Sequence, residues 1–350
     1  MPISAVDTVP LAFQHTRRQL LQPFRFGQWT RLAIVGLLAG EMGSGSSNFS
    51  SPFKSMPHTA PHSLGGLFPG INLAVIAALI SVVIVAGLIF ALIFLYISSV
   101  MRFILFDSVL TRQCHIRAGW SRRQGTAVNY FWWQLGYGFV TFLGSVVIFG
   151  IPAAIAFGMG WFAAPHDHME ALILTGVIVF SVFCFFMIVA VIGQVLTKDF
   201  VIPQMALEGI GPIEAWRRLW PMIEGEFNSY AMYILMKIVL AIGAGIIIGI
   251  AALIVAAMVA VPIAGVVLAA VLAGKSAGLT WNVLTITGAV VVACVVLAIL
   301  FYVIALVSVP AIVFFPAYSI YFFAPRYRPL SLALYPPPTP PLSPLPQPAG

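Results

Sequence analysis

Residues 71–99 read INLAVIAALISVVIVAGLIFALIFLYISS, a stretch without a single Asp, Glu, Lys or Arg. A transmembrane α-helix needs about 20 predominantly apolar residues to cross the hydrocarbon layer of a bilayer. The hydrophobicity of this stretch is continuous, whereas a strand of a membrane β-barrel alternates over about ten residues. The stretch therefore predicts a membrane-spanning helix.

The same composition extends over the rest of the chain. Charged residues make up 8% of the 350 residues and the mean hydropathy is +1.04. A soluble domain keeps roughly a quarter of its residues charged. Further runs without charged residues occupy 124–166, 171–197, 238–274 and 276–325. We therefore predict an all-α integral membrane protein.

The basic residues predict how the chain is oriented. They cluster in Arg17 to Arg31, Arg102 to Arg123, Lys198 to Lys237, and Arg326 with Arg328. Cytoplasmic loops of membrane proteins carry an excess of Lys and Arg. Placing these clusters inside predicts a cell-membrane protein with both termini in the cytoplasm. The net charge of +7 then orients the protein and attracts anionic lipids, and no basic stripe of the nucleic-acid-binding kind occurs.

This orientation predicts about six spans. They cover 28–40, 71–99, 129–162, 171–196, a segment from about 230, and 283–308. The predicted outer loops hold Glu41, Lys54, Asp167, Glu170 and Lys275. Val309–Phe323 is interpreted as an interfacial or re-entrant segment, with a seventh span as the alternative. The membrane domain covers 1–334, and the proline-rich tail 335–350 is expected to be disordered or extended.

Three pairs of arginines indicate an internal repeat. Each pair is preceded by an Asp-x-Val element and followed by aromatic residues. The pairs are Arg17-Arg18, Arg122-Arg123 and Arg217-Arg218, and the elements begin at Asp7, Asp107 and Asp199. We predict three units, about 7–100, 101–197 and 198–325, each a short amphipathic segment followed by a helical hairpin.

The amphipathic segments supply the candidate functional residues. Six arginines and three tryptophans are expected at the lipid-headgroup level: Arg17, Arg18, Arg122, Arg123, Arg217, Arg218, Trp29, Trp216 and Trp220. They either anchor the protein or bind anionic lipids. Two carboxylates are expected to clamp spans to these segments: Asp107 by pairing with Arg102 or Arg122, and Asp199 by pairing with Lys198 or the Arg217-Arg218 segment.

Other candidate sites carry weaker signals. His166, Asp167 and His168 are a weak candidate for a divalent metal, as are His58 and His62 in a Pro/Ser-rich loop. Lys237 is interpreted as snorkelling to the cytoplasmic surface. The Gly-x-x-x-Gly at Gly245 and Gly249 is expected to pack against a neighbouring span, with a homo-oligomer contact as the alternative.

Two stretches resemble a known group of proteins. They are Asp199-Phe200-Val201-Ile202-Pro203, continuing through Ala215-Trp216-Arg217-Arg218, and Leu20-Leu21-Gln22-Pro23-Phe24. Both are similar to poorly characterised bacterial multi-pass families related to the membrane domain of some glycerophosphodiester phosphodiesterases. The resemblance implies a membrane module without the catalytic phosphodiesterase domain.

Three functions are compatible with the sequence. The first is a non-enzymatic membrane protein that acts as an accessory or scaffold in envelope or lipid homeostasis. The second is a transporter or channel for a small or amphiphilic solute, which a polar cavity between the hairpins would favour. The third is a membrane-embedded enzyme of lipid metabolism. No nucleophile elbow, phosphate-binding loop or paired-cysteine zinc motif occurs in the sequence, so we predict no enzymatic activity and no cofactor.

Overall fold

The computed structural model describes residues 4–22, 24–41, 73–162, 166–276 and 283–336. In these ranges the regular structure is entirely helical. In chain order the helices are α1 (Thr8–Leu21), α2 (Phe26–Leu38), α3 (Leu73–Thr111), α4 (Ile116–Gly158), α5 (Met169–Leu196), the π-helical turn η3 (Thr197–Val201), α6 (Ile202–Glu208), α7 (Pro212–Gly225), α8 (Phe227–Ser276), α9 (Val283–Phe323) and α10 (Arg328–Leu334). The predicted all-α fold class is confirmed for this part of the chain.

Five of the described helical segments are long and apolar enough to cross a membrane. They are Ala77–Thr111, Ile116–Gly158, Met169–Glu208, Phe227–Val267 and Ile286–Phe323. The chain is therefore a multi-pass helical membrane protein. The first predicted span, 28–40, corresponds to α2, which has 13 residues. At 1.5 Å per residue α2 extends about 20 Å, less than the hydrocarbon thickness of roughly 30 Å. The count of six spans stays a prediction.

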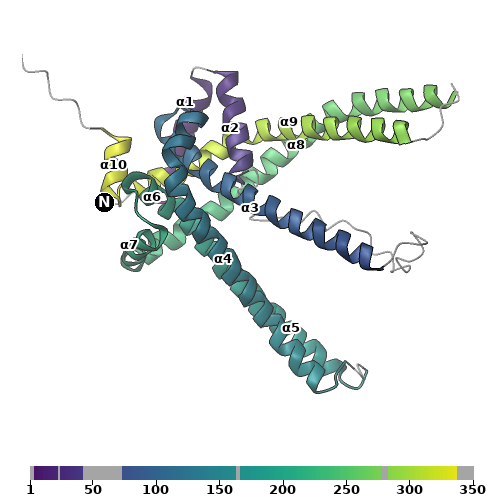
Figure 1. Ribbon diagram of the computed structural model, residues 1–350. Helices are drawn as coiled ribbons and strands as arrows, with labels where there is room; N and C mark the ends of the chain where they lie inside the picture. The colour runs from purple at the N-terminus through teal and green to yellow at the C-terminus, as the bar shows by residue number, and fades with distance from the viewer. Residues whose placement is uncertain (1–3, 23, 42–72, 163–165, 277–282, 337–350) are drawn as a thin grey trace, which may run out of the picture.

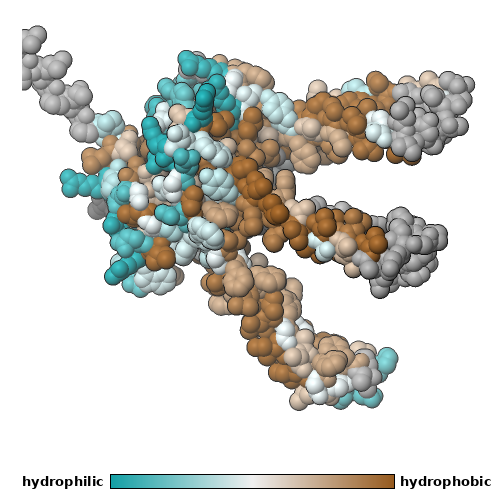
Figure 2. All heavy atoms as spheres, in the orientation of Figure 1, coloured by the Kyte–Doolittle hydropathy of each residue, from teal (hydrophilic) through white to brown (hydrophobic). Residues whose placement is uncertain are grey.

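The long helices converge at one end and diverge at the other (Figure 1). The converging ends pack with α1, α2, α6, α7 and α10 into a body that we call the head. Three arms leave it: α3, the α4–α5 pair and the α8–α9 pair. Figure 2 shows hydrophilic residues over the head and hydrophobic residues along the arms. In the most apolar 18-residue stretch of each span, at most 6% of the residues are buried inside the protein. This exposure is expected for helices that are surrounded by lipid.

The last turns of α9 belong to the core of the head. Val309–Phe323 continues α9 without interruption, so the predicted re-entrant turn is wrong. The interfacial position of this segment stays a prediction. Pro310 and Pro316 lie inside the helix. Prolines are tolerated in a membrane helix when neighbouring groups satisfy the freed backbone atoms. Here α1 and α2 pack against α9 and most of its side chains in this segment are buried.

Aromatic side chains fill the centre of the head. The Tyr233 ring of α8 stacks on Tyr318 of α9, with centroids 5.1 Å apart and an interplanar angle of 8°. Phe200 of η3 contacts Tyr233, Phe322 and Phe323, with centroids between 5.1 and 5.9 Å apart. All five rings are at most 2% exposed to solvent. Aromatic packing therefore fixes η3 between α8 and α9, and η3 carries two of the charged residues considered below.

A glycine sets where α2 ends. Gly40 has a left-handed backbone with φ of +76°. Its N–H bonds the Leu37 carbonyl at 3.1 Å, and the Glu41 N–H bonds the Gly36 carbonyl at 2.8 Å. These two bonds form a Schellman motif, which closes a helix and reverses the chain. The prediction that Glu41 lies in an outer loop is wrong, because this turn directs its side chain back into the head.

The three arginine pairs occupy three different local structures. Arg17-Arg18 lies on α1, Arg122-Arg123 lies near the start of α4, which continues directly into an arm, and Arg217-Arg218 lies on the separate helix α7. The first pair is followed by the short α2 rather than by a described hairpin. The repeat architecture stays a prediction.

Candidate functional site

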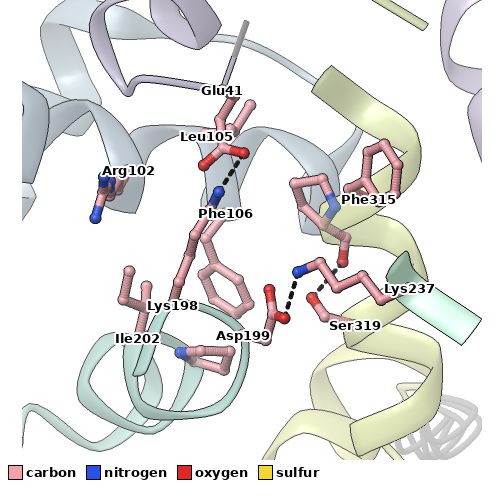
Figure 3. A pocket seen from close by; sticks show the side chains of 12 residues that line it. Glu41, Arg102, Leu105, Phe106, Lys198, Asp199, Ile202, Lys237, Phe315 and Ser319 are labelled. Atoms are coloured by element: carbon pink, nitrogen blue, oxygen red, sulfur yellow. Dashed lines mark hydrogen bonds and ion pairs between the residues drawn. The ribbon is translucent and has the colours of Figure 1, made fainter. Parts of the chain in front are cut away.

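Five charged side chains from four parts of the chain meet inside the head (Figure 3). Glu41 follows α2, Arg102 lies on α3, Lys198 and Asp199 lie on η3, and Lys237 lies on α8. We call these five residues the ionic cluster. They line a small pocket together with apolar side chains such as Phe106 and Phe315. Charged residues inside membrane proteins are rare and are typical of functional sites.

Asp199 accepts hydrogen bonds from two residues of α8. Lys237 Nζ donates a hydrogen bond to Asp199 Oδ2, and Tyr233 Oη donates to the same oxygen at 2.9 Å. The side chains of Lys237 and Asp199 are 9% and 5% exposed. Lys237 therefore does not snorkel to the surface, as the sequence predicted, because a buried carboxylate lies within its reach. The partner of Asp199 also differs from the predicted Lys198 or Arg217-Arg218 segment.

Glu41, the second carboxylate of the ionic cluster, accepts a hydrogen bond from Lys198. Its side chain is 2% exposed, and Lys198 Nζ donates a hydrogen bond to Glu41 Oε2. Burial acts to raise the pKa of Glu41, but the positive charges of Lys198 and Arg102 outweigh it and the net pKa is lowered. Glu41 is therefore ionised at neutral pH, and this carboxylate joins the end of α2 to η3.

Arg102 has neutral partners in the described structure. Its Nε donates to the Ala39 carbonyl at 3.1 Å and its Nη1 donates to Tyr130 Oη at 2.7 Å. Tyr130 is itself buried, with its ring edge-on to Phe103 at 5.7 Å. The guanidinium thus joins α3 to the end of α2 and to α4. Within the described residues no carboxylate lies within 4.0 Å of it.

The pocket is small. Its cavity volume is about 30 Å³, enough for one or two waters and too little for an organic substrate or a lipid headgroup. Three cations and two carboxylates line it. The site therefore has the chemistry of an ion-binding site or a structural lock rather than that of a substrate pocket.

The predicted clamp residue Asp107 lies at the junction of the first and second arms. Arg123 forms two parallel hydrogen bonds with it, from Nε at 2.8 Å and from Nη2 at 2.7 Å. Arg123 Nη1 also donates to the Ala206 carbonyl of α6 at 2.5 Å. The partner is the second arginine of the repeat pair rather than the predicted Arg102 or Arg122. Bidentate pairs of this kind are strong and geometrically specific.

The third arginine pair is engaged with carboxylates. Arg218 binds Glu208 and Glu214, and Arg217 lies 4.0 Å from Glu214. The Trp216 ring nitrogen donates to Thr197 Oγ1 at 3.1 Å, which attaches α7 to η3. Two further predicted interfacial tryptophans also donate hydrogen bonds. They are Trp220, which donates to Glu224, and Trp29, which donates to the Leu20 carbonyl at 3.0 Å.

The other two arginine pairs contribute to a surface rich in unpaired cations. Eight described exposed arginines have no carboxylate within 4.0 Å. One is Arg328 on α10, and we call the other seven the basic face: Arg17, Arg18, Arg25, Arg31, Arg112, Arg117 and Arg122. They lie on the α1–α2 and α3–α4 corners. Gln28 bonds the Arg112 carbonyl at 2.9 Å and His15 bonds the Val109 carbonyl at 3.0 Å, so the two corners lie side by side.

The candidate metal and packing motifs lie on the arms. His166, Asp167 and His168 lie at the tip of the α4–α5 arm, exposed or half-buried, and no described group of three His, Cys, Asp or Glu residues is arranged to hold a metal ion. His58 and His62 lie outside the described residues. Gly245 and Gly249 are exposed, and a Cβ atom at either would have no neighbour within 4 Å. In the described structure these glycines therefore do not pack against another span, contrary to the prediction.

Sequence reasoning missed most of the ionic cluster. Glu41 and Lys198 are 157 residues apart in sequence, and Asp199 and Lys237 are 38 apart. Pairings at such separations depend on how the helices pack, which no local pattern reports. One signal was available: Lys237 interrupts an apolar segment, and a buried lysine requires a counter-charge.

Comparisons with known proteins give one match. A family model described as "Family of unknown function (DUF7544)" matches residues 3–333. No curated protein and no solved structure matches the chain. The match does not link the chain to glycerophosphodiester phosphodiesterases, so that resemblance stays a prediction.

Proposed function

The chain belongs to the DUF7544 family, whose function is unknown, and from that premise we propose that it is a non-enzymatic membrane protein that holds anionic lipids. In this proposal the basic face binds the lipid phosphates, and the protein acts as an accessory or scaffold in lipid or envelope homeostasis. The head faces the cytoplasm, because the basic face and both terminal helices α1 and α10 belong to it and cytoplasmic segments are enriched in Lys and Arg.

The observation that carries the proposal is the contrast between two groups of arginines. Arginines elsewhere in the head, such as Arg123, Arg218 and Arg326, bind carboxylates. The seven of the basic face are exposed without such partners. Arginine side chains that only stabilise the fold are expected to find internal partners. Guanidinium groups without a carboxylate partner beside the inner ends of the spans are suited to lipid phosphates, which they bind through parallel hydrogen bonds.

Exposed apolar side chains accompany these arginines. On α1, Phe13 and Leu21 are 63% and 54% exposed, and Phe24 and Phe26 in the α1–α2 corner are each 59% exposed. The opposite side of α1, including Ala12 and Leu20, is buried in the head. A helix with one face in the protein and a second face of Arg and Phe is suited to the headgroup region of a membrane, where aromatic rings and cations are both stable.

The proposal is tested by native mass spectrometry of the purified protein with phosphatidylglycerol and phosphatidylcholine. The test variant changes Arg17, Arg18 and Arg122 to Gln. Each basic residue near an anionic surface contributes about 1 kcal/mol. Losing three should therefore weaken phosphatidylglycerol binding about 100-fold and leave phosphatidylcholine binding unchanged.

Two controls make the result specific. Changing Arg17, Arg18 and Arg122 to Lys keeps the charge and should retain most of the binding. Changing Arg217 and Arg218 to Gln removes charge from a region that is already paired, and should change binding less than threefold. If the Gln variant binds phosphatidylglycerol like the wild type, the basic face orients the protein in the membrane and the lipid proposal is wrong.

A transporter or channel for a small solute is the second candidate function. The observation that favours it is the polar cavity where the arms meet, lined by Glu41, Lys198 and Lys237 among others. At about 30 Å³ it admits water or a small ion. Flux of ions and small solutes into proteoliposomes, compared between the wild type and Lys198→Met, tests this function. Wild-type flux equal to that of protein-free liposomes would argue against this function, and a variant as active as the wild type would argue against a path through the cavity.

A further inference from the structure

The charges that line the cavity do not balance. The cations Arg102, Lys198 and Lys237 outnumber the carboxylates Glu41 and Asp199. Lys237 binds Asp199 and Lys198 binds Glu41. The Arg102 guanidinium then has the Ala39 carbonyl and the Tyr130 hydroxyl as its hydrogen-bond partners. Arg102 is half-buried, and the carboxylate whose charge it feels, Glu41, is hydrogen-bonded to Lys198. The five side chains therefore carry one more positive than negative charge, and a partly buried excess charge is stabilised by a nearby opposite charge.

No other carboxylate side chain of this sequence supplies the missing negative charge. The ten Asp and Glu residues all fall within the described ranges, and eight lie away from the cavity. Four bind other arginines: Asp107, Glu208, Glu214 and Glu226. The rest are Glu224, which accepts a bond from Trp220, Asp167 and Glu170 at the tip of the α4–α5 arm, and Asp7 beside the start of α1. Among the described residues, the cavity therefore has one positive charge in excess.

We propose that the cavity binds one small monovalent anion, a halide such as chloride, held by Arg102 and the two lysines of the ionic cluster. One such anion gives the cluster a net charge of zero. The proposal concerns the interior of the head and does not depend on lipid binding by the basic face.

The available donors and the cavity volume favour a halide. A guanidinium has five N–H donors and an ammonium has three. The described partners occupy two donors of Arg102 and one each of Lys198 and Lys237, so several donors remain. A cavity of about 30 Å³ accommodates an ion close to the size of water and excludes phosphate or a lipid headgroup. The Lys198 side chain is 25% exposed, which gives the ion a route from solvent.

The test measures thermal unfolding of the purified full-length protein in gluconate, chloride and bromide at equal ionic strength. Chloride and bromide should raise Tm by about 5 °C at saturation, because a ligand that binds the folded state stabilises it. Gluconate, which is too large for the cavity, should not raise Tm. Equilibrium dialysis with radioactive chloride should find about one ion per chain, as the proposal requires.

Variants of one residue separate charge balance from general salt effects. Arg102→Gln leaves two cations with two carboxylates, so the chloride shift and the bound ion should both disappear. Arg102→Lys keeps the charge and should keep both. Lys198→Met removes a different cation of the cluster and should also abolish the chloride shift and the bound ion. With two such variants, the inference can still be tested if one of them fails to fold.

The outcomes are distinct from those of the lipid test. The Gln variant of Arg17, Arg18 and Arg122 should retain the full chloride shift. The inference is overturned if the wild type binds no chloride, if gluconate stabilises as well as chloride, or if Arg102→Gln keeps the chloride shift.

Discussion

Replacing Lys237 with Met tests whether the buried ion pair holds the head together. The change removes the ammonium and leaves Asp199, 5% exposed, as a buried carboxylate. Removing one member of a buried pair typically costs about 3–5 kcal/mol. Tyr233 still donates its hydrogen bond to Asp199 at 2.9 Å, so we expect the lower end of this range. The free energy of unfolding should therefore fall by about 3 kcal/mol.

The assay is reversible denaturation in mixed micelles, followed by tryptophan fluorescence. Trp216 is a suitable reporter because its ring nitrogen bonds Thr197 of η3. The matched control is the double variant Lys237→Met with Asp199→Asn, which removes both charges and should lie within about 1 kcal/mol of the wild type. A loss below about 1 kcal/mol for the single variant, or a double variant as unstable as the single one, refutes the reasoning.

Three further predictions concern the packing of the head. A Cβ at Gly36 would lie 2.5 Å from Ile312. Gly36→Leu should therefore destabilise the protein by about 1–3 kcal/mol, measured by thermal unfolding. Unchanged stability would show that α2 does not pack closely on α9. Burial lowers the pKa of His15 below 6.5. As the pH drops, the unfolded chain therefore takes up a proton at His15 at a higher pH than the folded protein does, and the free energy of unfolding should fall below about pH 6.5. His15→Gln should remove this dependence on pH. Arg123→Gln should cost about 1–3 kcal/mol by leaving Asp107 without its bidentate partner, whereas Arg123→Lys should cost less, and equal losses would argue against a specific clamp.

The sequence predicts the helices of the arms well, because a membrane span is a local property. The segments 171–196 and α5, Met169–Leu196, nearly coincide. Any helix at these positions must be continuous and apolar to cross a bilayer, and this can be recognised without knowing its neighbours. Hydrophobicity also led to the prediction that residues 28–40 form the first span. It does not show that a glycine with a left-handed backbone, Gly40, ends α2 after 13 residues.

The candidate site was predictable only in part. Asp107 and Asp199 were singled out as clamp residues, and both do bind a cation from another helix. Their partners were predicted incorrectly. Asp107 binds Arg123 rather than the adjacent Arg122, because the orientation of α4 decides which of the two side chains reaches it. Asp199 binds Lys237, which helix packing brings close although it is 38 residues away. Lys237 was assigned to the surface for a related reason: a long side chain near the end of a span can snorkel, and the sequence does not show that a carboxylate lies nearby.

The contacts of α1 have a consequence for the order in which the protein assembles during synthesis. His15 bonds Tyr321 across 306 residues, and the Ala5 carbonyl accepts a bond from Tyr318 across 313. At about 5–20 residues per second, α1 leaves the ribosome roughly 15–60 s before its binding surface on α9 exists. The N-terminal helix is thus expected to dock last, after the arms have been inserted. Nascent chains halted before residue 300 should leave α1 open to protease, and full-length chains should protect it.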